Sequence, residues 1–215
     1  MGNELEDPAV QKPFEDLIDE FVSSRHSRSG IHRVLRELSE LDHALYRAVA
    51  GTTTPTVDDP LRRLSNAANR SAIWIAAAGL LAAIGGRRGR RAALAGLTSV
   101  GVTSAVVNVA IKNLYIRDRP DRKSSGVVES RHTQMPKSSS FPSGHSASGF
   151  AFATAVGFQI PSLSFPLRVL AATVAYSRVH SGVHFPGDAI VGSLVGGWIG
   201  LFIGARFDHP LPKGR

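Results

Sequence analysis

The second half of the chain holds charged and polar residues of the types that phosphate chemistry requires. These residues are Lys112, Arg119, Ser143, Gly144, His145, Arg178, His184 and Asp188. The cations among them would repel one another if brought together, so an anion must neutralise them. Phosphate fits best, because arginine offers a planar fork to two phosphate oxygens and lysine a point charge. Ser143 and the backbone N–H groups of Gly144 and His145, at a helix start, can donate further bonds and complete a predicted phosphate cradle.

The two histidines of this set supply what phosphoryl transfer still lacks, a nucleophile and a proton donor for the leaving oxygen. His184 and Asp188 are four residues apart, so on a helix they share one face. A carboxylate bonded to one ring nitrogen fixes the tautomer and leaves the other nitrogen free to attack. His145 is then the acid. The residues predict phosphoryl transfer through a phosphohistidine on His184.

A metal site is the alternative for these three side chains, since two histidines and an aspartate can bind zinc. A metal cation would have to sit among several positive side chains, which disfavours it electrostatically. The chain has no cysteine, which excludes a disulfide framework and any thiolate metal site. We therefore expect catalysis without a metal or other cofactor.

The candidate residues lie at the ends of five apolar segments, 72–86, 92–111, 146–167, 169–177 and 189–205. A helix needs roughly 17–25 residues to cross a bilayer, so the 20 uncharged residues of 92–111 and the 22 of 146–167 are the strongest spans. Because successive spans alternate in direction, the polar clusters at these ends must share one membrane face. The pattern predicts an all-α, multi-pass transmembrane helical bundle of about five spans in the cell (inner or plasma) membrane. A soluble all-α domain with buried helices is the alternative, because the mean hydropathy is near zero.

The chain divides into four predicted regions. Residues 1–30 are interpreted as a flexible or loosely docked tail, rich in proline and charge. Residues 31–70 are predicted to form amphipathic, interfacial helices, because apolar residues recur at helical spacing between Ile31 and Val49. Residues 71–207 are the predicted membrane-embedded core, and residues 208–215 form a short tail.

The net charge of +8 first suggests a nucleic-acid partner. Its distribution favours another partner, because the arginine clusters border apolar runs instead of marking one face of a helix. We expect a lipid-phosphate substrate and membrane lipids as partners, and no nucleic acid. Small residues along the last segment let helices approach closely and offer a surface for a homo-oligomer. These residues are Gly192, Gly196, Gly197, Gly200 and Gly204.

Three motifs, in this order, resemble those of the type 2 phosphatidic acid phosphatase (PAP2) superfamily, in its membrane-bound lipid phosphatase branch. The superfamily carries Lys-x6-Arg-Pro, Pro-Ser-Gly-His and Ser-Arg-x5-His-x3-Asp, and all three are present with the correct internal spacing. The matching residues are Lys112, Arg119 and Pro120, then Pro142 to His145, then Ser177, Arg178, His184 and Asp188. The resemblance spans about residues 41–207, and a match in three parts is very specific.

The resemblance implies an all-helical core in which His184 is the nucleophile, Asp188 orients it and His145 protonates the leaving group. Phosphate oxygens would be bound by Lys112, Arg119 and Arg178, with Ser143 and Gly144 completing the cradle. Water would then hydrolyse the phosphohistidine, and no cofactor is implied. Membrane members of the superfamily act on phosphatidic acid, phosphatidylglycerol phosphate, prenyl diphosphates and prenyl-linked sugar phosphates. We therefore expect a metal-independent phosphatase of one such lipid.

Two other functions are compatible with the same cradle. Haloperoxidases of this superfamily hold vanadate in it, but they resemble larger soluble proteins without apolar spans. A non-catalytic lipid-binding membrane protein would keep the cradle as an inert site. Segment 121–140, rich in serine and basic residues, is predicted to lie over the cradle as a lid or headgroup contact. Its basic residues are Arg122, Lys123, Arg131 and Lys137.

The membrane face of the active site does not follow from the sequence. If the basic loop 87–91 is cytoplasmic, the active site lies outside, whereas a cytoplasmic N-terminus places it inside. The positive-inside rule does not decide, because the arginines of loop 87–91 support the first orientation and the basic residues between Arg25 and Arg70 support the second.

Overall fold

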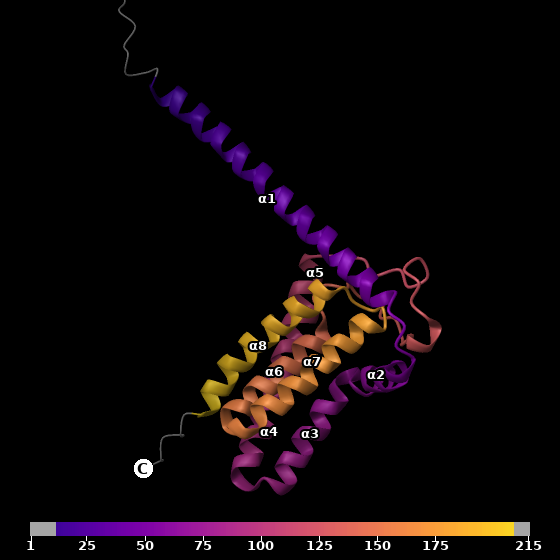
Figure 1. The fold of residues 1–215 in the computed structure, drawn as a ribbon. Helices are drawn as coiled ribbons and strands as arrows, with labels where there is room; N and C mark the ends of the chain where they lie inside the picture. The colour runs from indigo at the N-terminus through magenta and orange to yellow at the C-terminus, as the bar shows by residue number, and fades with distance from the viewer. Residues whose placement is uncertain (1–11, 209–215) are drawn as a thin grey trace, which may run out of the picture. The chain divides into compact units, whose positions relative to one another are not determined.

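The computed structural model describes residues 12–208, with side chains described from residue 30 to residue 207. Within this range every regular element is a helix (Figure 1), which confirms the predicted all-α class. The chain divides into two compact units, Met1–His43 and Ala44–Arg215, and each is described by itself. Residues 1–11 and 209–215, which are parts of the two predicted tails, lie outside the described residues.

The described part of the first unit is one long helix, α1 (Lys12–Ala50), whose last residues from Ala44 belong to the second unit. The sequence predicted a tail up to residue 30, but α1 runs without a break through residues 12–30. No proline follows Pro13 in this stretch, so nothing there forces the helix to end. The apolar side chains from Ile31 to Leu41 are exposed, and their location at a membrane interface stays a prediction.

The second unit contains the end of α1 and all the other described helices. In chain order these are α2 (Pro55–Ala67), η1 (Asn69–Ser71), α3 (Ala72–Ile84), α4 (Gly86–Ala105), the π-helix η2 (Val106–Ile111), α5 (Lys112–Leu114), η3 (Glu129–Arg131), α6 (Gly144–Gln159), η4 (Pro161–Leu163), α7 (Ser164–His180) and α8 (Pro186–Asp208). Helices α4, η2 and α5 follow one another without a gap. A long loop, 115–143, then leads into α6 and contains only the short helix η3.

Helix α6 lies in the middle of the second unit and contacts α4, α7 and α8. Its contact with α8 is unusually close, because glycines of α8 face the backbone of α6. A Cβ added at Gly196 would lie 1.9 Å from the carbonyl oxygen of Ala147, and one at Gly192 would lie 2.4 Å from that of Ser143. Gly192 and Gly196, which were predicted to let helices approach closely, therefore allow two helices of the same chain to pack together.

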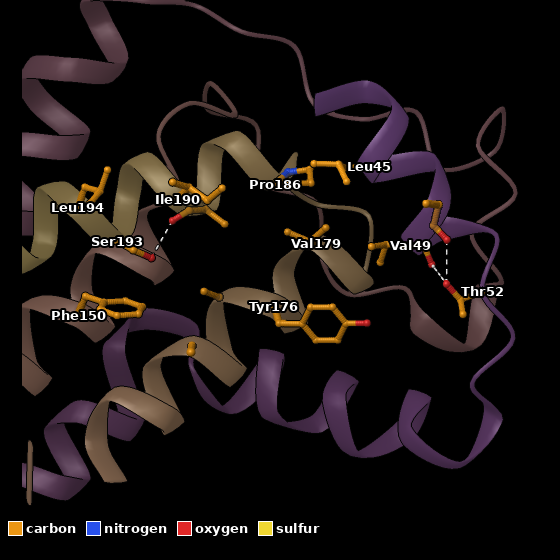
Figure 2. Close-up of a pocket in the computed structure, with 14 residues that line it drawn as sticks. Leu45, Val49, Thr52, Phe150, Tyr176, Val179, Pro186, Ile190, Ser193 and Leu194 are labelled. Carbon is orange, nitrogen blue, oxygen red and sulfur yellow. Dashed lines mark hydrogen bonds between the residues drawn. The ribbon is translucent and has the colours of Figure 1, made fainter. Parts of the chain in front are cut away.

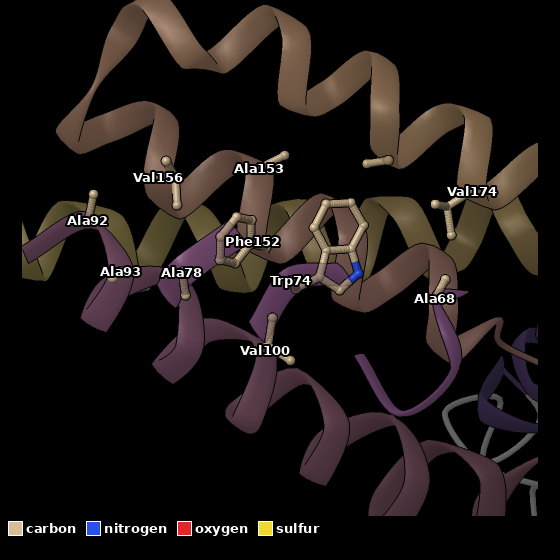
Figure 3. Close-up of a cluster of buried hydrophobic side chains, with 11 residues drawn as sticks. Ala68, Trp74, Ala78, Ala92, Ala93, Val100, Phe152, Ala153, Val156 and Val174 are labelled. Carbon is tan, nitrogen blue, oxygen red and sulfur yellow. The ribbon is translucent and has the colours of Figure 1, made fainter. Parts of the chain in front are cut away.

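The apolar core of the second unit lies between α3, α4, α6 and α7 (Figure 3). Trp74 of α3 is 1% exposed, and its ring centroid lies 5.5 Å from that of Phe152 in α6. Most of the other core residues are alanine and valine, such as Ala78, Ala92 and Val156. Small side chains keep the helix axes close, so the polar ends of the helices are held at short distances from one another.

Helix length alone identifies fewer spans than the sequence predicted. Among the described residues, two helices are long and apolar enough to cross a membrane, Gly86–Leu114 with 29 residues and Pro186–Phe207 with 22. A third span results if Pro55–Ala67 and Asn69–Ile84, which are bent by 64°, count as one. Helix α6, with 16 residues, is just shorter than the usual length, and α7, with 17, is at its lower limit. Large apolar side chains such as Leu94, Ile190 and Trp198 remain exposed, as expected for a protein in a bilayer.

Candidate active site

The structure places five of the eight predicted residues around one cavity of about 230 Å³: Lys112, Arg119, Gly144, His145 and His184. The other three lie just behind them. Ser143 caps α6 and accepts a hydrogen bond from the Ser146 N–H at 3.4 Å. Arg178 is 1% exposed near the end of α7, and Asp188 is fully buried in the first turn of α8. Segments that are far apart in the sequence therefore meet at one end of the bundle.

His184 is buried, with its two ring nitrogens in different surroundings. Nδ1 lies 3.5 Å from Asp188 Oδ2, while Nε2 lies 3.4 Å from the Arg119 guanidinium. Burial is the main cause that lowers the pKa of His184, to about 4. The imidazole is therefore neutral at physiological pH, which a nucleophile requires. With the Nδ1 proton directed at Asp188, the Nε2 lone pair is the one that can attack.

The prediction that His184 and Asp188 share a helix face needs a correction. His184 lies before α8, which begins at Pro186. The pair is instead held by the helix start, where the Asp188 carboxylate accepts the Phe185 N–H at 2.9 Å. This is the acidic half of a capping box, in which the third helical residue bonds back to the residue before the helix. This hydrogen bond holds the Asp188 carboxylate at the start of α8, 3.5 Å from His184 Nδ1.

Two partners of Asp188 were missed by the sequence analysis. Arg117 donates to Asp188 Oδ1 at 2.8 Å, and its guanidinium lies 4.2 Å from the centre of the Phe185 ring. Ser140 donates its hydroxyl to Oδ2 of the same carboxylate. One signal in the sequence could have indicated this. Glu129 and Asp188 are the only acidic residues between residues 122 and 207, so a buried aspartate there must serve several cations.

His145 is oriented by a residue that no motif contains. Its Nε2 lies 3.1 Å from Asn69 Oδ1, in the short helix η1 between α2 and α3. Since an amide oxygen accepts hydrogen bonds, this contact places the Nε2–H of His145 on the Asn69 side of the cavity. Asn69 therefore fixes the ring of the predicted acid.

The three predicted phosphate-binding cations are largely buried and have no carboxylate partner within the described part of the chain. Lys112 Nζ donates only a long bond to Ser138 Oγ at 3.4 Å. Arg178 donates to Ser65 Oγ at 2.6 Å, and its Nε has no partner. Arg119 donates to the carbonyls of Ser138 and Val183, each at 3.0 Å. Burial lowers the pKa of the Arg119 guanidinium, as expected where a cation lacks water and a counter-ion.

The uncompensated charge makes this cavity suited to an anion. The nearest carboxylate, Asp188, is already bonded to Arg117 and Ser140. The N-terminus of α6 adds the backbone N–H groups at Gly144, and a Cβ at Gly144 would lie 3.9 Å from Lys112 Nζ. Among the residues that the structure describes, no group of three or more His, Cys, Asp or Glu side chains is arranged to hold a metal ion.

Segment 121–140 borders the cavity, but two of its four basic residues have a structural role in place of the predicted headgroup contact. Arg131 is 1% exposed and bonds Asp58 at 2.9 Å and Thr54 Oγ1 at 3.1 Å. Arg122 donates to the Thr133 carbonyl at 2.9 Å. These two arginines anchor the loop, while Pro136 and Ser138 face the cavity. The cavity also has walls that no motif indicated: Arg70, Ser71, Ser104, Asn108 and Ser148.

A second and larger hollow of about 670 Å³ lies elsewhere, between the end of α1, α7 and α8 (Figure 2). Its walls are apolar, with side chains such as Leu45, Val179 and Ile190. Two of its hydroxyl groups are bonded to backbone carbonyls, Thr52 to Ala48 at 2.8 Å and Ser193 to Ala189 at 2.8 Å. It contains none of the predicted site residues and offers no cation to a phosphate.

Comparisons with known proteins agree with the geometry. The model of the PAP2 superfamily matches residues 92–208. A decaprenylphosphoryl-5-phosphoribose phosphatase of Mycobacterium tuberculosis is 35% identical over 142 residues, which are 66% of this chain and 76% of the relative. The undecaprenyl-diphosphatase BcrC of Bacillus subtilis is 33% identical over 119 residues, 54% of this chain and 58% of the relative. A transmembrane PAP2 type phosphatidylglycerolphosphate phosphatase from Bacillus subtilis has a TM-score of 0.64 at 22% identity, with 83% of this chain and 90% of that chain covered, and so has the same fold.

Proposed function

The chain belongs to the PAP2 superfamily, and we propose that it is a membrane phosphatase that removes the terminal phosphate of a prenyl-linked lipid through a phosphohistidine on His184. One observation carries the catalytic part of the proposal. The Nε2 atom of a neutral, buried His184 lies 3.4 Å from Arg119 at a cavity that Lys112 also lines. A nucleophile and anion-binding groups thus meet where a phosphoryl group can be held.

In the first step, His184 Nε2 forms a bond to phosphorus while the bond to the leaving oxygen breaks. The electron pair of the broken bond stays on the leaving oxygen. That oxygen takes the Nδ1 proton of a doubly protonated His145, whose Nε2–H stays bonded to Asn69. Asp188 stabilises the positive charge that develops on the His184 ring. Lys112, Arg119 and Arg178 bind the three oxygens of the transferred group, and their charge is most valuable as negative charge spreads over those oxygens.

In the second step, water attacks the phosphorus of the phosphohistidine. His145, which has lost its proton to the leaving group, is now a base and takes a proton from that water. The N–P bond breaks, its electron pair returns to His184 Nε2, and inorganic phosphate is released. No metal is needed, because the protein cations supply the charge stabilisation.

The prenyl-linked substrate is supported by the relatives that match by sequence. Their printed names concern a decaprenylphosphoryl sugar phosphate and undecaprenyl diphosphate. The structural match at 22% identity supports the fold and does not choose between lipids. We further propose that the protein is a multi-pass protein of the cell membrane, with the cavity end of the bundle at one membrane surface.

A hydrolysis panel in detergent tests the function. The panel contains a prenyl diphosphate, a prenyl-phosphoryl sugar phosphate and phosphatidic acid, each with and without EDTA. We expect phosphate release by the wild type and by His132→Ala, a histidine outside the cavity, in both conditions. His184→Ala should release none. Loss of activity in EDTA would contradict the metal-free mechanism, and equal release by His184→Ala would remove His184 as nucleophile.

The covalent intermediate has its own test. Brief incubation of the wild type with a substrate labelled in the terminal phosphate should leave acid-labile, alkali-stable label on the protein. No label is expected on His184→Ala. On His145→Ala, label should accumulate if the substitution slows hydrolysis of the intermediate. A wild type that turns over substrate without label under rapid quench would rule out the covalent step.

We propose that any homo-oligomer forms through the outer face of α8. Gly192 and Gly196 pack on α6, so they are occupied within the chain. The exposed residues Ile190, Leu194 and Trp198 leave an apolar face on the same helix. Chemical cross-linking in membranes with Trp198→Cys would give a dimer band if this face pairs, and a band from Arg90→Cys alone would point to another interface.

A further inference from the structure

One wall of the active-site cavity is a tight corner that belongs to none of the motifs. It is the three-residue helix η1, Asn69–Ser71, where the chain turns from α2 into α3. Arg70 and Ser71 both line the cavity, together with Lys112, His145 and His184. The corner therefore borders the same cavity as the reacting groups, although it lies far before them in the sequence.

The backbone of this corner is held in an unfavourable conformation. Arg70 has φ 54° and Ser71 has φ 60°, values that residues with a side chain rarely adopt. Ordered residues flank this corner on both sides: before it, the Ala68 N–H bonds the Leu64 carbonyl at 3.0 Å, and after it, Trp74 is buried. Residues in strained conformations at a cavity wall are frequent at functional sites, where the strain directs a side chain.

Asn69 shows which side of the substrate this corner faces. Its Oδ1 lies 3.1 Å from Nε2 of His145, the residue that protonates the leaving oxygen. The corner is thus next to the group that must touch the leaving oxygen. The cations that hold the transferred phosphoryl group are Lys112, at the start of α5, and Arg119, in the loop that follows.

Arg70 is a further cation of the cavity and is available to a ligand. Its side chain is exposed, and within the described residues it has no hydrogen-bonded or ion-paired partner. The polar groups that line the cavity with it, Ser104, Asn108 and Ser148, carry no charge. An anion on the leaving-group side is what would pair with this arginine.

We infer that Arg70 binds a second phosphate on the leaving side, so that the enzyme prefers lipids whose leaving group itself carries a phosphate. This inference rests on the proposed function and narrows its substrate class. When the terminal phosphoryl group moves to His184, the bond between phosphorus and the leaving oxygen breaks and its electrons stay on that oxygen. In a diphosphate the oxygen belongs to the inner phosphate. In a prenyl-phosphoryl sugar phosphate the leaving group is an alcohol that carries a phosphodiester further along.

A phosphomonoester with a simple alcohol as leaving group gives Arg70 nothing to bind. Geranylgeranyl diphosphate and geranylgeranyl monophosphate are therefore a matched pair, with the same chain and one phosphate of difference. A prenyl-phosphoryl pentose phosphate is the third substrate. Its comparison with the diphosphate shows whether Arg70 binds a phosphate joined directly to the terminal one or a phosphodiester on the far side of the sugar. Arg70→Gln removes the charge, Arg70→Gly also relieves the positive φ, and Arg70→Lys retains the charge.

The kcat/KM of each variant is measured on the three substrates in detergent. We expect Arg70→Gln and Arg70→Gly to lower kcat/KM for the diphosphate, the pentose phosphate or both by roughly 10- to 100-fold. Activity on the monophosphate should stay within about twofold, and Arg70→Lys should recover much of the loss. Arg90→Gln is the control. It removes the same charge from a residue that lies roughly 30 Å from Lys112 along the continuous helix.

The two ideas can fail separately. If the wild type hydrolyses none of the lipids, the proposed function is wrong. If it hydrolyses them but Arg70→Gln and Arg70→Gly lower all three substrates equally, or lower none, the inference about Arg70 is wrong. A wild type that prefers the monophosphate over both other lipids would also overturn it. Melting temperatures of the purified variants show whether a uniform loss comes from unfolding.

Discussion

Asp188 takes more hydrogen bonds than a simple orienting partner of His184 would need. Its carboxylate receives Arg117, the Ser140 hydroxyl and the Phe185 N–H. These bonds leave it little freedom to turn away from the ring, at 3.5 Å from Nδ1. The orientation of the His184 ring, the proposed nucleophile, therefore depends on Arg117, which does not itself line the cavity.

Arg117→Ala tests this dependence. Loss of the ion pair leaves a buried carboxylate with one partner fewer, so we expect kcat to fall by roughly 10- to 100-fold with KM changed little. Arg117→Lys should recover part of the activity. Formation of the labelled phosphohistidine, measured under rapid quench, should slow by the same factor as kcat. An increase in KM alone would mean that Arg117 contacts the substrate.

The pKa of His184 gives a prediction for stability. Because burial lowers it to about 4 from roughly 6.5 in the unfolded chain, the unfolded state binds more protons between these values. The free energy of unfolding should fall as the pH drops from about 6.5 to about 4, by roughly 3 kcal/mol at most. In His184→Asn this part of the pH dependence should be absent. Denaturant unfolding in detergent at several pH values measures the difference between the two proteins.

At the residue scale, the sequence predicted which residue types bind phosphate, but it did not predict which other side chains contact them. The cradle residues could be chosen because only cations and histidines suit phosphate, and they stand in a spaced pattern. Asn69, Arg70 and Ser140 have ordinary types for turns and loops. They reach the site through tertiary packing, which no local pattern encodes.

At the level of elements, the contact between α6 and α8 positions the site. The Ser143 N–H bonds the Asp188 carbonyl at 2.9 Å, so the two helix starts are joined directly at the cavity. Gly192 keeps this approach possible, because its Cβ would lie 2.4 Å from the Ser143 carbonyl oxygen. The distance between the phosphate cradle and His184 therefore depends on small residues further along α8.

Two adjacent glycines of α8 provide a matched test. A Cβ at Gly196 would lie 1.9 Å from the Ala147 carbonyl oxygen, whereas one at Gly197 would have nothing within 4 Å. Gly196→Ala should push the helices apart, with a destabilisation of about 1–3 kcal/mol and a marked loss of activity. Gly197→Ala should be neutral or slightly stabilising in a helix interior. Thermal unfolding and kcat/KM are compared, and equal effects at both positions would contradict the packing described.

The anchor of loop 115–143 is a second feature at this scale. Arg131 is buried against Asp58, so Arg131→Met would leave this carboxylate in the interior with only Thr54 and His180 as partners, at a cost of about 3–5 kcal/mol. The loop carries Arg119 and Ser140, and limited proteolysis between residues 121 and 137 should become faster. Lys137→Met removes an exposed charge from the same loop and should leave the proteolysis rate unchanged.

The elements themselves were predicted unevenly. The apolar segments 92–111 and 189–205 correspond to the two long helices Gly86–Leu114 and Pro186–Phe207, because a continuous apolar run is a strong signal. The π-helix Val106–Ile111 was not predicted, since its sequence is as apolar as the turns before it. Helix α1 also covers residues 12–30, for which the prolines and charges predict a flexible or loosely docked tail.

For the whole molecule, all cavity residues and their partners belong to the second unit. They extend from Ala68 to His184, with Asp188 behind them. Deletion of residues 2–40 should therefore leave kcat/KM in detergent within about twofold, since no group that contacts substrate is removed. A large loss of activity would show that the first unit contributes to the site or to folding.

A longer deletion, to residue 50, is the informative comparison. Tyr46 is 2% exposed, and its ring centroid lies 5.3 Å from that of Phe185, the neighbour of His184. Removal of Tyr46 and Ala50 should expose apolar surface next to His184 and lower both the melting temperature and the activity. The two deletions together locate the boundary of the functional core more closely than composition could.

Helix α6 begins at the cavity, and its start carries a partial positive charge from the peptide dipoles. The attraction thus acts on any phosphate, including the inorganic phosphate that the reaction leaves behind. Product and substrate compete for the same oxygen-binding groups, so turnover slows as free phosphate accumulates. We therefore expect inorganic phosphate to inhibit the enzyme competitively, so that its rate depends on the phosphate concentration of the compartment that the cavity faces.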